Sequence, residues 1–215
     1  MRLTLNKSFE TSVARSERVI KVAEAFGLGL ESREFTVLDD VEVDVEPGDV
    51  VYICGQSGAG KSVLLRELSH MLAEQGQKVA NIDGVELDES RALIDQIGGE
   101  SMAEAIRLLS VAGLSDAYLY IRRPSELSDG QRYRYRLAKL LESDADVWVA
   151  DEFGAVLDRV TAKIVAWNLA KVARAHQKTL IVATTHTDLK DELAPSLTVT
   201  KRFHDRIKIE TVHGD

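Results

Sequence analysis

The sequence predicts an α/β fold in which a mainly parallel β-sheet is covered by helices on both faces. Three apolar runs have the length of buried strands, and they span residues 50–54, 146–150 and 180–184. Helix-like patterns lie between these runs, and a glycine-rich turn joins the first run to the helix that follows it. Strands that alternate with helices in this way form parallel sheets with two covered faces.

The composition is that of a globular protein with one domain. The chain has 215 residues, of which 45% are hydrophobic and 29% are charged. No run approaches the roughly 20 apolar residues that span a bilayer, and the N-terminus lacks the apolar core of a signal peptide. One cysteine, Cys54, excludes an internal disulfide framework and agrees with a reducing cytoplasm. We therefore expect a single cytoplasmic domain over residues 1–215.

The net charge of the chain limits which macromolecules it is expected to bind. At −8 it argues against non-specific coating of nucleic acid, because that affinity comes mainly from neutralised phosphates. A local basic patch is still compatible with this charge, so nucleic acid stays open as a partner. A membrane partner is not expected.

The N-terminal part is predicted to contain a helix and a strand. Residues 12–26 place apolar side chains among charged ones at helical spacing. Residues 36–45 alternate between valine and polar residues, which is typical of a half-buried strand. Residues 46–49 read Glu-Pro-Gly-Asp, the order that a type II turn prefers. The strand and helix around the glycine-rich turn follow, and then a short strand at 78–82.

The rest of the chain is predicted to hold a helical lobe and the end of the sheet. Residues 91–113 look largely helical, with an interruption at Gly98 and Gly99. Because residues 88–128 carry little strand signal, we expect them to form a lobe on the core. A long helix is predicted over 158–176 with Asp158 as its cap, and two further strand-like runs lie in 196–212.

The glycine-rich turn is a complete phosphate loop. It reads GQSGAGKS and comprises Gly55, Gln56, Ser57, Gly58, Ala59, Gly60, Lys61 and Ser62. Its glycines permit backbone angles and a close approach that a Cβ would block, so backbone N–H groups surround the phosphates. Lys61 reaches the β- and γ-phosphates, and the Ser62 hydroxyl is a ligand for Mg²⁺. The sequence therefore predicts binding of a nucleoside triphosphate with Mg²⁺.

Two carboxylates end the apolar run at 146–150. Asp151 is placed to hold Mg²⁺, and Glu152 to orient or deprotonate the attacking water. The alternative is an acidic strand end that faces solvent.

Three further matches, in order, give the chain a family resemblance. Residues 127–131 read LSDGQ and resemble the LSGGQ signature of ABC-type ATPases. Residues 152–158 end in Leu-Asp and are similar to the D-loop of that family. His186 follows a buried strand in ATTH, as the switch histidine does. The chain thus resembles a P-loop NTPase of ABC type, which implies N-terminal antiparallel strands beside the parallel core and a short helical lobe.

The resemblance implies an ATPase that works as a dimer. In the family, two copies associate head to tail and trap two ATP molecules between them. Ser128, Gly130 and Gln131 of one copy would meet the γ-phosphate held by the other, because a hydroxyl, an amide and a helix N-terminus are donors aimed at negative charge. Asp158 would join this site from the D-loop, and His186 would contact the γ-phosphate.

Two further residues match functional positions of the family, and each has an alternative interpretation. Gln96 matches the Q-loop glutamine that senses Mg²⁺ and the attacking water, and an ordinary surface glutamine is the alternative. Phe26, before Gly27, resembles the aromatic residue that stacks on adenine. Packing of Phe26 into a core is the alternative, and Phe35 is a rival for the same role.

The sequence also departs from the family pattern. Asp129 replaces a signature glycine, and Phe153 replaces the proline that commonly follows the acidic pair. The distance from Gln96 to Leu127 is shorter than in transporter ATPases, which use this segment to receive a membrane partner. The chain looks most like soluble ABC ATPases that are fused to, or encoded with, GNAT-type acetyltransferases. We therefore expect an ATP-dependent homodimer that acts on an acetyltransferase or another protein.

Other functions stay open. The first alternative is the ATPase subunit of an ABC membrane transporter, and another is a nucleotide-gated binding module with negligible turnover. Residues 132–136 alternate arginine and tyrosine, which in principle suits stacking on nucleic acid. Alternation at two residues, however, spreads the cations over several faces of a helix, so a structural or interface role is favoured.

Overall fold

The computed structural model describes residues 1–202 and 207–212. Its contacts divide the chain into two compact units. One comprises Arg2–Val43, and the other comprises Met1 together with Asp44–Asp215. Each unit is described by itself below. In the part of the chain that the structure describes, no helix has the length and apolar character needed to cross a bilayer.

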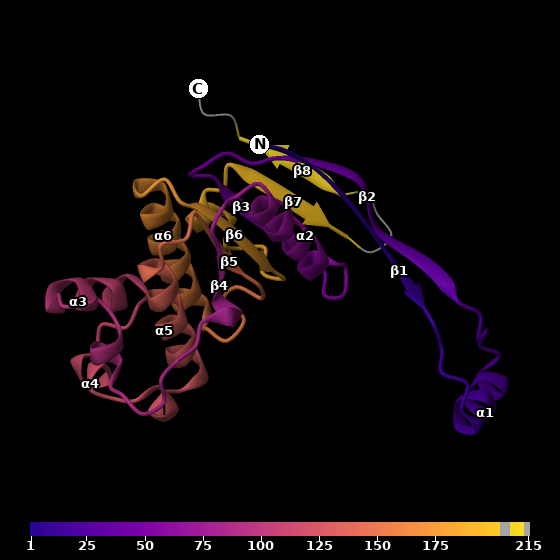
Figure 1. Cartoon of the computed structure of the whole chain (residues 1–215), viewed down its shortest axis with the longest axis horizontal. Coiled ribbons are helices and arrows are strands. Elements are labelled where there is room, and N and C mark those ends of the chain that lie inside the picture. Colours follow the sequence, from indigo (N-terminus) through magenta and orange to yellow (C-terminus); the bar gives the residue numbers. More distant parts are fainter. Residues whose placement is uncertain (203–206, 213–215) are drawn as a thin grey trace. The chain divides into compact units, whose positions relative to one another are not determined.

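The larger unit is built on a six-stranded sheet (Figure 1). Its strands are β3 (Val50–Gly55), β4 (Val79–Asn81), β5 (Val147–Ala150), β6 (Thr179–Thr184), β7 (Leu197–Lys201) and β8 (Lys208–Thr211). The spatial order is β4-β5-β6-β3-β7-β8. All neighbouring pairs are parallel except β7 with β8, which is antiparallel. The predicted mainly parallel α/β core is therefore confirmed.

Helices cover both faces of this sheet, which is why its strands read as continuous apolar runs. Val50, Tyr52 and Cys54 of β3 share one buried cluster with residues of α5 (Asp129–Glu142) and α6 (Arg159–Ala175). The side chains between them point to the opposite face. There α2 (Lys61–Glu74) buries its leucines at 64, 65, 68 and 72. The phosphate-loop strand is thus enclosed on both sides.

A lobe of short helices follows β4. It contains the 3₁₀ helices η1 (Ile82–Gly84), η2 (Leu93–Gln96) and η3 (Pro124–Glu126), with α3 (Met102–Val111) and α4 (Ala117–Tyr120). The long helix predicted from residue 91 is wrong at its start, because only one 3₁₀ turn forms before residue 102. Gly98 is the reason: its φ is +82°, and a Cβ there would collide with the backbone of Ala105. Ser101 then caps α3 by accepting from the Glu104 N–H.

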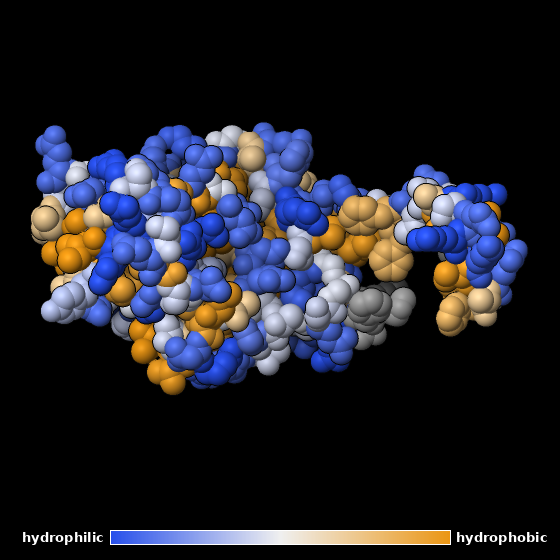
Figure 2. Space-filling model, turned by 90° about the horizontal axis from the view of Figure 1, so that it is seen from below, coloured by the Kyte–Doolittle hydropathy of each residue, from blue (hydrophilic) through white to orange (hydrophobic). Residues whose placement is uncertain are grey.

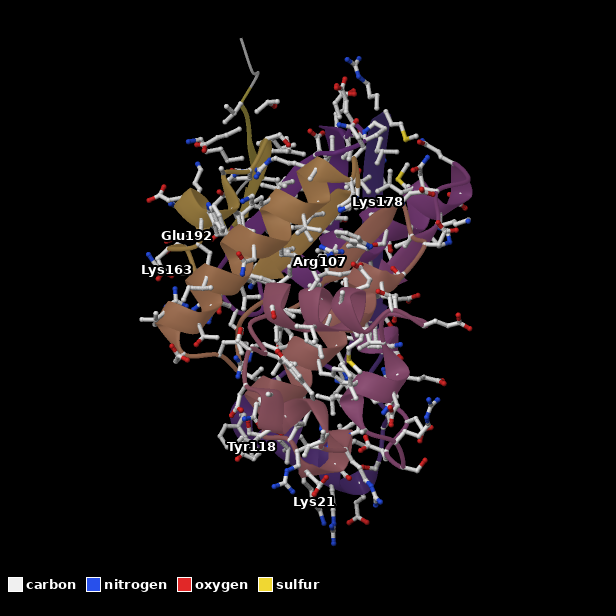
Figure 3. The ribbon with its side chains drawn as sticks, turned by 90° about the vertical axis from the view of Figure 1, so that its left-hand side faces the viewer. Lys21, Arg107, Tyr118, Lys163, Lys178 and Glu192 are labelled. Atoms are coloured by element: carbon white, nitrogen blue, oxygen red, sulfur yellow. The ribbon has the colours of Figure 1, made fainter. Side chains whose placement is uncertain are left out.

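The end of the larger unit places α7 (Lys190–Leu193) beside α6. Lys163 of α6 pairs with Glu192 of α7 at 2.9 Å, and Figure 3 shows the two side chains next to each other. The predicted turn at 46–49 is present: Asp49 N–H donates to Glu46 O, and Gly48 has a φ of +89°. Asp158 caps α6, as predicted, by accepting from the Thr161 N–H at 3.0 Å.

The smaller unit is a two-stranded ribbon with one helix. Its elements are β1 (Arg2–Thr11), α1 (Glu17–Phe26) and β2 (Arg33–Asp44). Side-chain hydrogen bonds join Asn6 to Asp40 and Ser8 to Thr36, so the strands run antiparallel, as expected. Helix α1 starts five residues later than residue 12, because Ser16 caps it, and Gly27 ends it with a φ of +63°. Figure 2 shows apolar atoms exposed at the α1 end of this unit.

Candidate nucleotide site

The phosphate loop joins β3 to α2. Gly55, Gly58 and Gly60 all have positive φ values, of +146°, +73° and +92°. Gly60 is the N-cap residue of α2, so the free N–H groups of the first helical turn face the loop. Because α2 is 14 residues long and starts at Lys61, this end carries a partial positive charge suited to phosphate.

Lys61 lies inside the loop that it closes. Its side chain is buried, and its ammonium donates to the carbonyl oxygen of Gln56 at 2.8 Å. Burial lowers the pKa of Lys61, while the nearby carboxylates of Asp151 and Glu152 oppose that shift. A cation held between a glycine loop and two carboxylates is the arrangement that a triphosphate with its metal ion would complete.

A cavity of about 480 Å³ opens at this loop. It is lined by Ser57, Gly58, Gly60, Lys61, Ser62, Val63, Asp151, Glu152, Ala155, Thr184 and Thr185. The structure therefore brings the phosphate loop and the acidic pair together. Among the predicted residues, Gly55, Gln56 and Ala59 belong to the loop but do not line the cavity. Val63, Ala155, Thr184 and Thr185 line it without having been predicted.

The acidic pair follows β5. Glu152 has a φ of +45°, a left-handed conformation that costs a residue with a Cβ about 1 kcal/mol. Its N–H donates to Asp151 Oδ1 at 2.9 Å, and the next N–H, of Phe153, donates to Ala183 O at 2.8 Å. Phe153 is fully buried and meets Tyr133 edge to face. The backbone is thus bent so that both carboxylates reach the cavity.

The donors at the cavity fit Mg²⁺. Ser62 and Asp151 both line the cavity, and a hydroxyl and a carboxylate are oxygen donors of the kind that Mg²⁺ prefers. Mg²⁺ typically takes one or two carboxylates, substrate phosphates and several waters, rather than a cage of protein ligands. The described residues hold no cluster of three or more His, Cys, Asp or Glu side chains that could hold a metal ion.

His186 lies just beyond the cavity wall formed by Thr184 and Thr185. Its N–H donates to Thr184 Oγ1 at 3.1 Å, and its carbonyl oxygen accepts from the Tyr52 hydroxyl. Burial, and then the positive charge of Arg159, lower the pKa of His186 below its ordinary value. The His186 ring therefore stays neutral at a lower pH than the ring of a free histidine.

The signature residues do not line the cavity of their own chain. Ser128 is the N-cap of α5: its hydroxyl accepts from the Gln131 N–H, and Gln131 Oε1 accepts from the Ser128 N–H at 3.0 Å. A Cβ on Gly130 would lie 3.1 Å from the carbonyl oxygen of Val156, so this helix start packs against the loop that leads to Asp158. A hydrogen bond from Thr161 lowers the pKa of Asp158.

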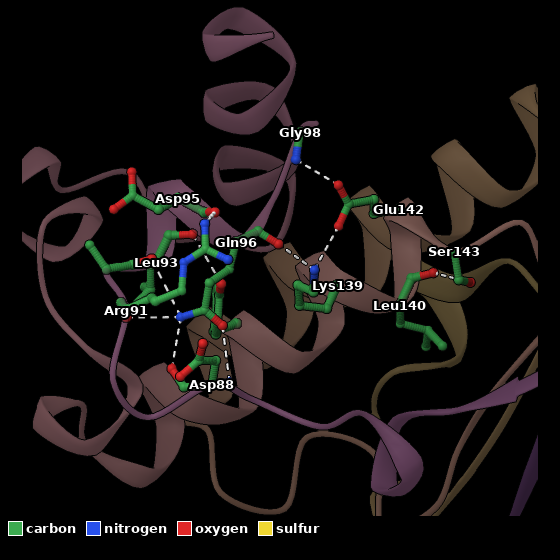
Figure 4. A network of polar contacts seen from close by, with 12 residues as sticks. Asp88, Arg91, Leu93, Asp95, Gln96, Gly98, Lys139, Leu140, Glu142 and Ser143 are labelled. Atoms are coloured by element: carbon green, nitrogen blue, oxygen red, sulfur yellow. Dashed lines mark hydrogen bonds and ion pairs between the residues drawn. The ribbon is translucent and has the colours of Figure 1, made fainter. Parts of the chain in front are cut away.

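Gln96 is not among the residues that line this cavity. Its Nε2 donates to the carbonyl oxygens of Asp88 and Arg91 at 2.9 and 2.8 Å, and its Oε1 accepts from the Asp88 N–H. Figure 4 shows this network together with Lys139, which bonds Gln96 O and Glu142. The amide thus holds its own segment in a closed turn.

Phe26 lies in the smaller unit at the end of α1. It is 75% exposed, so it does not pack into a core of that unit. Phe35, on β2, is 49% exposed.

The arginine and tyrosine side chains of residues 132–136 are mostly engaged within the lobe. Arg132 pairs with Glu89 at 2.6 Å, and Arg134 donates to Gly113 O at 2.6 Å. The Tyr135 hydroxyl donates to Leu93 O, while the Tyr133 hydroxyl accepts from the Gly154 N–H. These contacts favour the structural role over stacking on nucleic acid.

Comparisons with known proteins agree on one family. Residues 38–98 match the family described as ABC transporter. The chain is 34% identical over 204 residues to an aliphatic sulfonates import ATP-binding protein of Rhodococcus jostii, covering 87% of this chain and 78% of that protein. It is 30% identical over 168 residues to a cytochrome c biogenesis ATP-binding export protein of Gluconobacter oxydans, covering 71% and 75%.

A solved structure shows the same fold. It is the dimeric post-hydrolysis state of the ATP-binding cassette MJ0796 bound to ADP and Pi. Its TM-score is 0.69 at 17% identity, with all of both chains covered.

Proposed function

Because the chain belongs to the family of ABC transporter ATP-binding proteins and is an ABC-type ATPase, we propose that it hydrolyses Mg²⁺-ATP in the cavity at its phosphate loop. One observation carries this proposal: Lys61, Ser62, Asp151 and Glu152 line the same cavity. These are a phosphate-binding cation, two oxygen ligands for the metal and a base for water.

The proposed roles follow from position. The N–H groups of the loop and the Lys61 ammonium would bind the phosphates, and Ser62 and Asp151 would hold Mg²⁺. A bound Mg²⁺ would neutralise charge on the phosphate oxygens. Glu152 would orient or deprotonate the attacking water. His186 would contact the γ-phosphate from the loop beside Thr184 and Thr185.

We propose that the active form is a head-to-tail dimer with ATP at the interface. Ser128, Gly130 and Gln131 do not line the cavity of their own chain, yet Ser128 leads a helix start suited to bind an anion. A second copy would supply these groups to the triphosphate. The similar cassette of known structure is described as a dimer with ADP and Pi.

The relatives favour a membrane transporter as the partner. The relatives from Rhodococcus jostii and Gluconobacter oxydans are named as import and export ATP-binding proteins. Their names support the alternative stated above, the ATPase subunit of an ABC membrane transporter. The acetyltransferase-linked role has no counterpart among them. We therefore propose that this chain is the cytoplasmic ATP-binding subunit of a transporter, with the helical lobe facing the membrane protein. The shortness of that lobe keeps a soluble protein partner as the second candidate.

Light scattering and affinity capture test these proposals. The Glu152→Gln protein should be a monomer without nucleotide and a dimer with Mg²⁺-ATP, because hydrolysis no longer separates the copies. Lys61→Ala should stay monomeric in both conditions. Capture of Glu152→Gln from detergent-solubilised cells of the source organism should bring down a membrane protein, whereas recovery of a soluble acetyltransferase alone would favour the second candidate. No mass change with ATP in Glu152→Gln would refute the dimer.

A further inference from the structure

We propose that two buried hydroxyl groups, those of Tyr52 and Thr184, are positioning devices that set the place of His186 relative to Glu152. The inference rests on the proposed function, in which His186 contacts the γ-phosphate and Glu152 acts on the water that attacks it. It gives a positioning role to Tyr52 and Thr184, two side chains to which the proposed function assigns no contact with the nucleotide.

Tyr52 fixes His186 from the sheet. It lies in the middle of β3, its side chain is 1% exposed, and its hydroxyl donates to the carbonyl oxygen of His186. Strand β3 pairs with β6 on one side and β7 on the other, so its backbone is held by two ladders. A rigid ring on a doubly paired strand is a firm support for a loop.

Thr184 fixes His186 from the other side of the residue. It ends β6, is 1% exposed, and its Oγ1 accepts from the His186 N–H at 3.1 Å. The same hydroxyl donates to the carbonyl oxygen of Phe153 at 3.0 Å. Both the N–H and the carbonyl of His186 are therefore bound by side chains.

The Thr184 hydroxyl also connects the two proposed catalytic loops. Phe153 directly follows Glu152, and its N–H is bound to Ala183 O at 2.8 Å. The two peptide groups on either side of Phe153 are thus fixed to consecutive residues of β6. A shift of the His186 loop would pull on the same Thr184 hydroxyl that also holds the chain after Glu152.

A hydroxyl is required at both positions. Only a group that donates and accepts at once can join the Phe153 carbonyl to the His186 N–H, so serine can replace Thr184 and valine cannot. Phenylalanine at position 52 keeps the ring but leaves the His186 carbonyl without its donor. Because a displacement of about 1 Å at a reacting group can lower a rate by 100-fold, loss of one support should be visible in kcat.

The chain offers a matched control. Thr198 lies opposite Tyr52 on the neighbouring strand β7 and is 3% exposed. Its hydroxyl has no hydrogen-bond partner among the described residues. Thr198→Val thus makes the same chemical change as Thr184→Val, beside the same tyrosine, without touching His186.

Steady-state ATP hydrolysis tests the proposal first. Thr184→Val and Tyr52→Phe should each lower kcat roughly tenfold with little change in KM for ATP, because binding contacts stay in place. Thr184→Ser and Thr198→Val should keep wild-type kcat. In the His186→Ala background, Tyr52→Phe should cause no further loss, because a group that acts only through His186 cannot add to its removal. Thr184→Val should cause a smaller loss there than in wild type, because only its bond to Phe153 O still matters. Equal losses with and without His186 would overturn the inference.

NMR of the histidine ring separates this inference from the proposed function. The ring signal of His186, identified by its loss in His186→Ala, should move in Thr184→Val and in Tyr52→Phe but not in Thr198→Val. An unmoved signal in both variants would refute the positioning role. If the signal moves while His186→Ala hydrolyses ATP normally, the positioning is real and the proposed role of His186 is wrong.

Discussion

Gly55 and Lys201 face each other across β3 and β7 so closely that no side-chain carbon fits on Gly55. A Cβ there would lie 2.9 Å from the carbonyl carbon of Lys201 and nearer still to its oxygen, and φ is +146°. Gly55→Ala should therefore lower the free energy of unfolding by about 3 kcal/mol in urea denaturation. Gly84→Ala is the control, because no atom lies within 4 Å of its added Cβ. Equal stability of the two variants would contradict the packing described here.

Glu152→Gln should lower kcat for ATP by at least about 100-fold, because the amide cannot take a proton from water. Binding of ATP should persist, since Lys61 and the loop are unchanged. Phosphate release under saturating Mg²⁺-ATP measures the first effect, and equilibrium binding of a fluorescent ATP analogue measures the second. Comparable turnover in both proteins would remove Glu152 from its proposed role.

Ser128 has a structural and a proposed functional role, which two substitutions separate. Ser128→Ala should lose about 1 kcal/mol of stability, because α5 loses its cap. Ser128→Asp should keep the cap and the stability, since its carboxylate also accepts from the Gln131 N–H. Neither variant should form the ATP-dependent dimer, the first for want of a donor and the second through charge repulsion. A dimer with Ser128→Asp would argue against contact of this residue with phosphate.

The stability of the protein should depend on His186 at acidic pH. The pKa of His186 is lowered from 6.5 in the folded chain, so the unfolded chain binds a proton at this ring at a higher pH. The contribution of His186 to stability is thus complete above pH 6.5 and is lost as the pH falls through the folded pKa. From about pH 7.5 to about pH 5, wild type should lose more free energy of unfolding than His186→Gln. If stability fell equally with pH in both proteins, the pKa of His186 would not be lowered by folding.

Gln96→Ala should act on stability and not on chemistry. The amide bonds the backbone of its own segment, and deletion of these hydrogen bonds should cost about 1–2 kcal/mol. Turnover below the unfolding transition should stay within about twofold of wild type, because Gln96 does not line the cavity. A large fall in kcat at unchanged stability would restore the predicted role in sensing the attacking water.

Much of the core was predictable because its signals are local. The run 50–54 is apolar at every position since both faces of β3 are covered, and the glycines of the phosphate loop need their positive φ values wherever the motif occurs. Leu3 and Leu5 alternate with polar residues, and this pattern could have located β1, whose range was missed. The helix start at 102 depends on the close packing of Gly98 against Ala105, which no periodicity reveals.

The supports of the site were not predictable in the same way. The Tyr52 hydroxyl meets a carbonyl 134 positions away in the chain, and its neighbours in sequence give no sign of it. Gln96 has the residue type and setting of a Q-loop glutamine, but the turn from Asp88 to Ala92 presents carbonyls that bind its amide first. Partners distant in sequence and competition from nearby backbone groups are the two physical reasons why these contacts could not be predicted.

The central place of β3 has a consequence for exchange of its amide hydrogens with solvent. Its N–H and carbonyl groups are bonded to β6 and to β7, so releasing it means breaking two ladders at once. These amides should therefore exchange only when the whole larger unit opens. The phosphate loop is anchored to this strand, and a nucleotide bound there stabilises the folded state. Bound nucleotide should therefore slow amide exchange in every strand of the sheet.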